Sequence, residues 1–343
     1  MKTLTACLAA TVAACVLLQP TRAADQDEDA IVVTATRTAQ TADESLASVT
    51  VITREDIEKS QALSVPELVR GTTGLDVTAQ GGFGKLSSFF LRGANSNQVL
   101  ALVDGLRWGS VTAGSSPWEF LPLSEIERIE IVRGPRSSLY GSDAIGGVIQ
   151  IFTRSGKGPP TGRVELSVGS EDTTNVVAGL SGGNERNWYN ISASRFRTEG
   201  IDAREPVIEF GVPLDEPDLD GYDNTAFNAR YGHRFEKAGR FEFFATQASG
   251  NTEFDSSLGN EDDFTEQAIG ASYRLQAASR WNVLLQGGRT RDRRTTFRAD
   301  GSVADSRFNS EIQNLLWQND VTLTTAQLLT LGADFRRDKV DST

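Results

Sequence analysis

Apolar and polar residues alternate with a period of two along the second half of the chain. In 164–168, valine and leucine alternate with glutamate and serine, and the same pattern covers 227–235, 269–277 and 329–335. Because successive side chains of a β-strand point to opposite faces of the sheet, this pattern predicts strands with one apolar and one polar face. Nine strands of this kind fit between positions 162 and 340.

The connections between these strands are alternately short and long. Every second connection is a short turn, at 183–186, 236–239, 277–280 and 324–327. The others are long polar loops, at about 199–221, 252–264 and 291–306. A soluble sandwich has no reason to alternate its connections in this way, whereas outer-membrane barrels have short turns on the periplasmic side and long loops outside. The second half of the chain therefore predicts part of a membrane β-barrel.

The first half of the chain predicts a compact mixed α/β domain, from residue 29 to about 157. Helical patterns at 56–59 and 65–70 come first, the second with Pro66 near its start. Short apolar runs separated by glycine and polar turns then predict short strands, at 74–77, 89–93, 99–105, 129–134 and 147–152. A stretch rich in glycine and proline at 156–160 separates this domain from the alternating strands.

The N-terminus is typical of an exported protein. Lys2 precedes an apolar stretch at 4–18, and small residues at 21–24 offer a cleavage site. This order of charged, apolar and small-residue regions predicts a signal peptide over residues 1–24. A buried N-terminal helix is the alternative, but the acidic, unpatterned residues that follow at 25–29 argue against it.

The composition excludes several classes of protein. The chain has 343 residues, a formal net charge of −12 and 38% hydrophobic residues. No stretch beyond the N-terminal one approaches the roughly 20 apolar residues that a membrane-spanning helix needs. An acidic surface repels phosphates, so we expect no nucleic-acid partner.

Few residues suited to catalysis are available. Cys7 and Cys15, the two cysteines, lie in the expected signal peptide, so its removal would leave no disulfide and no thiol metal site. His233 is the only histidine, and it falls on the apolar face of a predicted strand, where a core or interfacial ring is the simpler interpretation. We therefore expect no enzyme, no histidine-bound zinc and no redox or organic cofactor.

Two segments carry a family resemblance. In 123–149, Gly134-Pro135 ends a strand, Tyr140-Gly141 makes a tight turn, and Gly146-Gly147 permits close backbone packing before a final strand. This run resembles the plug-domain signature of TonB-dependent outer-membrane receptors. A β-prone stretch near the N-terminus, suited to adding a strand to another protein's sheet, resembles the TonB box of that family. The box comprises Asp29, Ala30, Ile31, Val32, Val33, Thr34, Ala35 and Thr36.

The resemblance implies a fold and a domain organisation. Members have an N-terminal α/β plug domain inside an antiparallel membrane β-barrel of about 22 strands. The expected boundaries are a signal peptide over 1–24, a leader over 25–38, a plug domain over 39–158 and the N-terminal part of the barrel over 159–343. Nine strands are too few to close such a barrel, so we expect the chain to be a fragment that transports nothing alone.

Within the family, the similarity is to the branch that imports vitamin B12 (cobalamin). It covers the TonB box and the runs 86–93, 99–107 and 133–136. The resemblance implies that plug residues at matching positions contact cobalamin. These are Leu86, Ser88, Asn95, Ala113 and Gly114.

Acidic residues gather in two of the predicted loops. Calcium takes about six to eight oxygen ligands and suits flexible loops with clustered carboxylates, although a solvated acidic loop is the simpler interpretation of the residues alone. Cobalamin receptors order their outer loops with calcium, so the resemblance implies a loop-ordering Ca²⁺ site. Its expected ligands are Asp202, Glu216, Asp218, Asp220, Asp255 and Asp262 or Asp263.

Together these features predict a receptor in the outer membrane of a Gram-negative bacterium. We expect it to import cobalamin into the periplasm, energised by the proton gradient through TonB and its inner-membrane complex. A periplasmic binding protein is the expected next partner of the ligand. A siderophore or haem ligand on the same machine is the first alternative. A secreted or surface β-protein without transport is the second, and its recovery in the soluble periplasm without detergent would favour it.

Overall fold

The structure is a computed structural model that describes the residues 31–32, 40–41, 48–202, 208–209, 212–213, 218–236, 239–256, 259–298, 303–324 and 327–342. The expected signal peptide lies outside the described residues, and so does most of the expected TonB box. Within the box only the backbone of β1 (Ile31–Val32) is described, and it pairs antiparallel with β2 (Gln40–Thr41).

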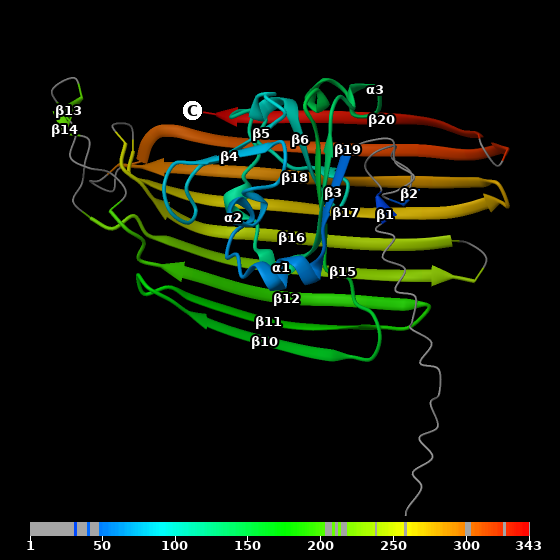
Figure 1. Ribbon diagram of the computed structural model, residues 1–343, viewed down its shortest axis with the longest axis horizontal. Coiled ribbons are helices and arrows are strands. Elements are labelled where there is room, and N and C mark those ends of the chain that lie inside the picture. Colours follow the sequence, from blue (N-terminus) through cyan, green and yellow to red (C-terminus); the bar gives the residue numbers. More distant parts are fainter. Residues whose placement is uncertain are drawn as a thin grey trace, which may run out of the picture.

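The largest element is a curved antiparallel sheet, in which nine strands of the described chain follow one another in sequence order (Figure 1). They are β10 (Thr161–Val168), β11 (Thr174–Gly183), β12 (Asn187–Thr198), β15 (Tyr222–Phe235), β16 (Gly239–Glu253), β17 (Glu261–Ala278), β18 (Trp281–Phe297), β19 (Val303–Thr324) and β20 (Gln327–Ser342). The nine predicted strands and the four predicted short turns are confirmed. The sheet is open: β10 and β20 each have one partner strand within the described residues.

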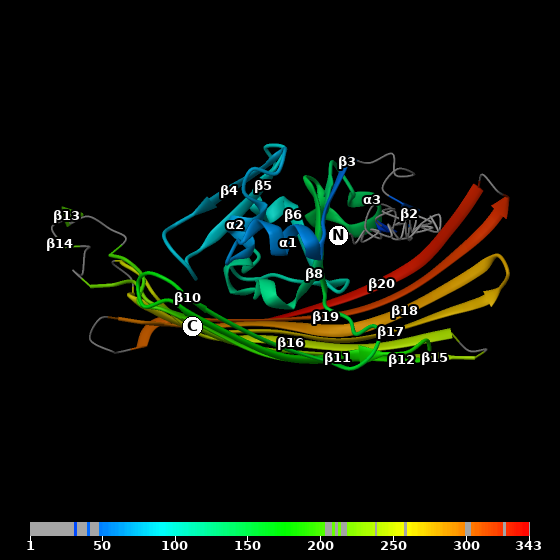
Figure 2. The ribbon, with the colours of Figure 1, turned by 60° about the horizontal axis from the view of Figure 1, so that its bottom comes forward.

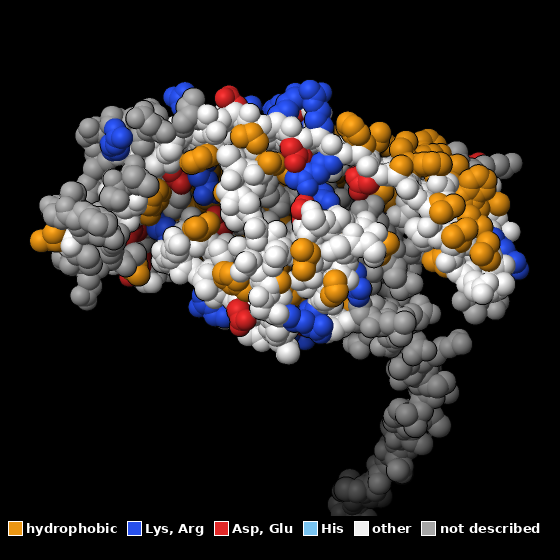
Figure 3. Space-filling view, turned by 90° about the horizontal axis from the view of Figure 1, so that it is seen from above, with side chains coloured by type: hydrophobic (Ala, Val, Ile, Leu, Met, Phe, Trp, Pro, Cys, Tyr) orange, Lys and Arg blue, Asp and Glu red, His pale blue; other side chains and the backbone are white. Residues whose placement is uncertain are grey.

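This nine-stranded sheet is called the wall. Its polar face is turned inward and its apolar face is turned outward. On β15, Asn224 and Asn228 are buried while Phe227 between them is 47% exposed. On the edge strand β10, Val164 is 81% exposed. Figure 3 shows exposed apolar side chains gathered toward one end of the molecule. An apolar outer face around a polar interior is the arrangement of membrane barrels.

Two of the three predicted long loops are shorter than expected. The loop predicted over 252–264 is confined to 254–260, because β16 continues to Glu253, which pairs with Glu261 of β17. The loop predicted over 291–306 is confined to 298–302, because β18 and β19 continue until Phe297 pairs with Val303. A ladder of backbone hydrogen bonds does not need apolar side chains, so a polar sequence here does not mark the end of a strand. The long connection between β12 and β15 is as predicted and contains the short hairpin of β13 (Ile208–Glu209) and β14 (Val212–Pro213).

The N-terminal domain lies against the concave face of the wall (Figure 2). Its five-stranded sheet has the order β3 (Ser48–Ile52), β8 (Ile126–Arg133), β9 (Gly147–Thr153), β6 (Val99–Val103) and β7 (Leu106–Arg107). A separate hairpin is formed by β4 (Leu75–Ala79) and β5 (Ser87–Leu91). The helices are α1 (Arg54–Ser60), α2 (Val65–Val69) and α3 (Ser137–Tyr140), with 3-10 turns η1 (Ser96–Gln98), η2 (Trp118–Phe120), η3 (Leu123–Glu125) and η4 (Ser142–Ala144).

Local sequence explains these elements. Thr53 and Asp56 form a capping box at the start of α1, and the Ser64 side chain caps α2. Ile131 and Ile149 are fully buried in the core between the sheet and the helices. At Gly147 a methyl group would lie 2.2 Å from the carbonyl oxygen of Val132, so only glycine lets β8 and β9 approach this closely. No helix in the described part of the chain is long and apolar enough to cross a membrane.

Candidate ligand-binding face and plug–barrel interface

The residues predicted to contact a ligand lie on exposed loops of the N-terminal domain. Leu86, which immediately precedes β5, is 39% exposed, and Ser88 within β5 is half-buried. Asn95, just before η1, is exposed, and so are Ala113 and Gly114 in the loop that follows β7. All five residues therefore lie at the surface of the N-terminal domain rather than in its core.

The structure brings these five residues together as two groups rather than one. A methyl group on Gly114 would lie 3.8 Å from the Cβ of Asn97, so the loop of Asn95 and the loop of Ala113 are neighbours. Leu86 and Ser88 lie at the other end of β5, beside the turn of the hairpin. A strand advances about 3.3 Å per residue, so a ligand that touched both groups would have to be large.

Acidic side chains gather at the rim of the wall, where the 199–221 connection meets the end of β16. The pKa of Asp218 is raised above its usual range by desolvation, and then by the neighbouring carboxylates of Asp255, Glu253 and Asp202. Such mutual repulsion is relieved by a bound cation, which is the behaviour expected of calcium ligands.

The remaining predicted calcium ligands are placed differently. Glu216 lies outside the described residues. Asp262 is buried and accepts a hydrogen bond from Thr296 Oγ1 at 2.6 Å, so one of its oxygens is bound to the wall. Asp220 is buried and Asp263 is exposed. Among the described residues no three acidic, histidine or cysteine side chains already have a metal-binding arrangement. Asp202, Asp218 and Asp255 fit a cation by charge, but the described side chains would have to move to surround it.

Aromatic rings join the N-terminal domain to the wall. Phe120 of η2 stacks on Phe264 of β17 with ring centroids 3.7 Å apart, and the Tyr222 ring lies 6.1 Å from that of Phe264. The Tyr222 hydroxyl donates to the Glu119 carbonyl oxygen at 3.3 Å. Phe83, in the turn of the β4–β5 hairpin, contacts Phe196 of β12, with ring centroids 4.8 Å apart.

A buried acid lies directly beneath these rings. The Glu119 side chain is 2% exposed, and its nearest cation is Arg294 of β18 at 3.9 Å. Desolvation raises the pKa of Glu119 to about 7, against the opposing charge of Arg294. Glu266, Asp292 and Asp262 of the wall face the same arginine. Four carboxylates thus share one nearby guanidinium at this interface.

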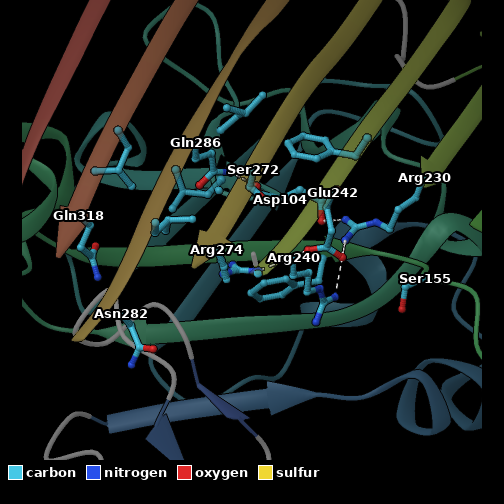
Figure 4. A pocket seen from close by; sticks show the side chains of 18 of the residues that line it. Asp104, Ser155, Arg230, Arg240, Glu242, Ser272, Arg274, Asn282, Gln286 and Gln318 are labelled. Carbon is cyan, nitrogen blue, oxygen red and sulfur yellow. Dashed lines mark hydrogen bonds and ion pairs between the residues drawn. The ribbon is translucent and has the colours of Figure 1, made fainter. Parts of the chain in front are cut away.

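A cavity of about 970 Å³ lies between the N-terminal domain and strands β15 to β20 (Figure 4). The turn between β6 and β7 enters it, and the Asp104 carboxylate of that turn forms an ion pair with Arg230 of β15. Thr153 donates to Asp104 through its backbone and its hydroxyl, at 3.1 and 2.7 Å. The Gln286 side chain of β18 donates to the Asp104 carbonyl oxygen at 2.6 Å. Two wall strands therefore hold one turn, and we call this contact the Asp104 latch.

The latch adjoins a second cluster of charges within the wall. Glu242 of β16 lies 3.8 Å from Arg230, 2.6 Å from Arg240 and 3.3 Å from Arg274. Arg230 therefore faces two carboxylates, one on the N-terminal domain and one on the wall. If the N-terminal domain moved away, Arg230 would keep a counter-ion in Glu242.

Comparison with known proteins identifies the architecture. Residues 41–148 match the family model described as the TonB-dependent Receptor Plug Domain. The chain therefore carries the plug domain of TonB-dependent receptors. The predicted fold class, an N-terminal α/β plug domain with an antiparallel barrel-type sheet, is thereby confirmed. The family consists of receptors and transporters rather than enzymes.

The plug and wall resemble both curated sequences and solved structures. The vitamin B12 transporter BtuB of Vibrio cholerae is 33% identical over 93% of this chain and 52% of its own length. BtuB of Photobacterium profundum is 30% identical over 96% of this chain and 53% of its own length. The chain thus spans about half the length of the curated relatives it matches.

Solved structures share the fold at lower identity. A mutant form of the ferric enterobactin receptor PfeA of Pseudomonas aeruginosa has a TM-score of 0.72 at 19% identity, covering 91% of this chain and 51% of that one. The siderophore receptor PiuA of Acinetobacter baumannii has a TM-score of 0.70 at 12% identity, covering 92% and 49%. These likenesses show the plug-in-barrel fold.

The sequence did not indicate the contacts that join plug and wall. Asp104 lies at the end of the apolar run 99–105, and Arg230 lies at a polar position of the alternating stretch 227–235, but nothing in the sequence pairs them. The only signal is indirect, because an arginine on the inward face of a strand needs a counter-ion. Lys85, next to the candidate ligand residue Leu86, was likewise not predicted to bind the wall.

Proposed function

We propose that this receptor imports cobalamin across the outer membrane. The observation that carries the proposal is the position of the exposed plug loops with Leu86, Asn95 and Gly114, inside the concave face of a barrel-type wall. The similarity to vitamin B12 transporters supports the ligand, and the spread of the two residue groups along β5 suits a large one. No bond is made or broken in this function, so we propose no enzymatic step.

The proposed energy source acts on the N-terminal segment. TonB, with its inner-membrane complex, captures residues 29–36 by strand addition and pulls on the plug. Import then requires the plug to give up its contacts with the wall, among them the Asp104 latch and the stacked rings of Phe120 and Phe264. Transport is a shift between two plug states, driven by work done on one segment. The released ligand passes to a periplasmic binding protein.

Calcium is part of the proposal. Bound at Asp202, Asp218 and Asp255, with Glu216, Asp220, Asp262 or Asp263 as further ligands, it would supply positive charge that offsets the carboxylate repulsion at the rim. The raised pKa of Asp218 supports this role, since it reflects desolvation and neighbouring negative charge. These residues would then order the 199–221 connection beside the plug loops.

Ligand binding by isolated outer membranes tests the proposed function. Membranes from cells that express the intact gene should bind cyanocobalamin at micromolar concentration or below, and a chelator should weaken the binding. Absence of binding would refute the choice of ligand. Competition by a ferric siderophore or haem, with no cyanocobalamin binding, would favour the alternative receptor. Recovery of the protein in the soluble periplasm would contradict the outer-membrane location itself.

A further inference from the structure

Lys85 is a buried lysine at the tip of the β4–β5 hairpin, and it reaches across to the wall. The residue is 4% exposed. Its Nζ donates to the carbonyl oxygens of Asp220 and Gly221, each at 3.1 Å, and to Thr252 Oγ1 at 3.1 Å. The Phe83 carbonyl oxygen of its own hairpin lies at 3.3 Å. An ammonium group has three donors, so these oxygens fully satisfy it.

Burial on this scale is costly for a lysine, which is almost never fully buried unless it is paired. Desolvation lowers the pKa of Lys85 to about 8, and the carboxylates of Asp220 and Glu253 oppose that effect. The oxygens that touch Nζ are nevertheless carbonyl and hydroxyl oxygens rather than carboxylates. The lysine is therefore held by directional hydrogen bonds, which fix a position more sharply than a diffuse charge does.

The hairpin tip around Lys85 is shaped to fit the wall. Gly84 has φ of +73°, and a methyl group there would lie 2.2 Å from Cδ2 of Tyr222, so the turn packs directly on that ring. Phe83 packs on Phe196, whose ring is also a neighbour of Tyr222. Figure 2 shows the hairpin of β4 and β5 reaching from the plug toward the end of the wall that carries β13 and β14.

The wall residues that bind Lys85 lie at the acidic rim where calcium is proposed to bind. Asp220 and Gly221 are the last residues of the 199–221 connection before β15 begins. Thr252 lies at the end of β16, and its neighbour Glu253 accepts a hydrogen bond from the Gly221 amide at 2.9 Å. Lys85 thus joins the plug hairpin, the base of the acidic connection and the end of β16. The next residue of the hairpin after Lys85 is Leu86, one of the candidate ligand residues.

We propose that Lys85 is a positioning residue for ligand binding, which clamps the plug hairpin to the base of the 199–221 connection so that Leu86 and the rim face the ligand as one surface. The proposal rests on the proposed function, because it assigns Lys85 a role at the same ligand face. It adds a plug-to-rim contact to the residues that were expected to touch the ligand or calcium. Lys85 itself does not touch the ligand.

Three variants test the clamp through cyanocobalamin binding to outer membranes. Lys85→Met keeps the length of the side chain but removes every donor, and should weaken binding about tenfold or more, since hydrogen bonds to a charged group are among the stronger ones. Lys85→Gln keeps an amide donor and should restore part of the affinity. Lys59→Met is the matched control, because Lys59 on α1 is 71% exposed and pairs with Glu55 of the same helix; it should bind like the parent.

A fourth variant tests Thr252, the side-chain partner of Lys85 on the wall. Thr252→Val removes one acceptor and should weaken binding about threefold. Combined with Lys85→Met it should add nothing further, because both changes remove the same contact. Independent, additive effects of the two substitutions would overturn the clamp.

A spin label gives a readout that does not depend on the ligand. Gly82→Cys would place a label on the exposed hairpin turn, where a Cβ has no atom within 4 Å, and the cysteines of this sequence, Cys7 and Cys15, lie in the expected signal peptide. The label should be more mobile in Lys85→Met than in the parent or in Lys59→Met. Heat-modified migration in gels should be unchanged in all variants, which shows that the barrel has folded.

The outcomes separate the clamp from the proposed function. A parent receptor that does not bind cyanocobalamin refutes the proposed ligand, while label mobility still decides whether Lys85 holds the hairpin. Parent-like affinity in Lys85→Met overturns the positioning role, whether or not the label becomes mobile. An immobile label in Lys85→Met overturns the clamp as well.

Discussion

The Asp104 latch predicts that Asp104→Asn loosens the plug within the wall. The Asp104 and Arg230 side chains are 4% and 10% exposed, and breaking a buried ion pair by removing one partner costs about 3–5 kcal/mol. Arg230 keeps two partners in the variant, because Thr153 Oγ1 lies at 3.0 Å and Glu242 at 3.8 Å. The introduced amide also keeps an acceptor for the Thr153 backbone. We therefore expect a smaller loss of docking free energy, about 2 kcal/mol.

Hydrogen exchange of the purified protein in detergent measures this loss. Amides in 99–107 should exchange about 30-fold faster in Asp104→Asn than in the parent, because about 1.4 kcal/mol corresponds to a factor of ten. Asp223→Asn is the matched control. It breaks the Arg195–Asp223 pair, in which Arg195 is 62% exposed, and should change the exchange by less than about threefold. Parent-like exchange in Asp104→Asn, or an equal effect of both substitutions, would show that the latch does not hold the plug.

Three further outcomes test the acidic rim, the buried acid and the plug core. Asp218→Asn combined with Asp255→Asn should remove the effect of a chelator on cyanocobalamin binding; a parent that binds equally with and without the chelator would argue against the calcium site. Burial raises the pKa of Glu119 to about 7 from an ordinary value of 4.5, so between these pH values the native state binds more protons than the unfolded state. The stability of the plug therefore falls as the pH rises from about 4.5 to 7. Denaturant titrations at several pH values should show that Glu119→Gln loses this pH dependence, which amounts to about 3 kcal/mol of unfolding free energy. An unchanged pH dependence in the variant would assign it to another group. Gly147→Ala would force a methyl group against the Val132 carbonyl oxygen, and should lower the denaturant midpoint of the plug or prevent its assembly; an unchanged midpoint would mean that β8 and β9 can separate freely.

The periodic part of the fold could be predicted from the sequence because each strand carries its own signal. Over residues 227–231 of β15 the apolar side chains face outward and the polar ones face inward, as the alternation requires, so the strand is recognisable without its neighbours. The ends of the strands carry no such signal. Whether Glu253 and Phe297 extend a strand depends on the partner opposite them, and both lie in polar sequence that also fits a loop.

The contacts that fix the plug could not be predicted for a different reason. Arg230 and Asp104 are 126 residues apart, and Lys85 and Asp220 are 135 apart. The sequence places each residue on a face or in a turn, but only the docking of two domains brings the partners together. The candidate ligand residues are a prediction from the resemblance, whereas their separation into two groups at opposite ends of β5 needed the structure.

The position of β3 determines which plug contact a pull from the N-terminus loads first. β3 is the first strand of the plug sheet and lies at its edge, and within the described chain its one partner strand is β8, over Ser48↔Arg133 to Ile52↔Ile129. The hairpin of Lys85 comes later in the chain, and the Asp104 latch later still, beyond β9 and β6 in the sheet. If TonB pulls on residues 29–36, the force therefore reaches the short β3–β8 ladder while the ligand face and the latch are still held. The chain order of these contacts favours a sequence in which the edge strand yields first, the clamped hairpin next and the buried ion pair last.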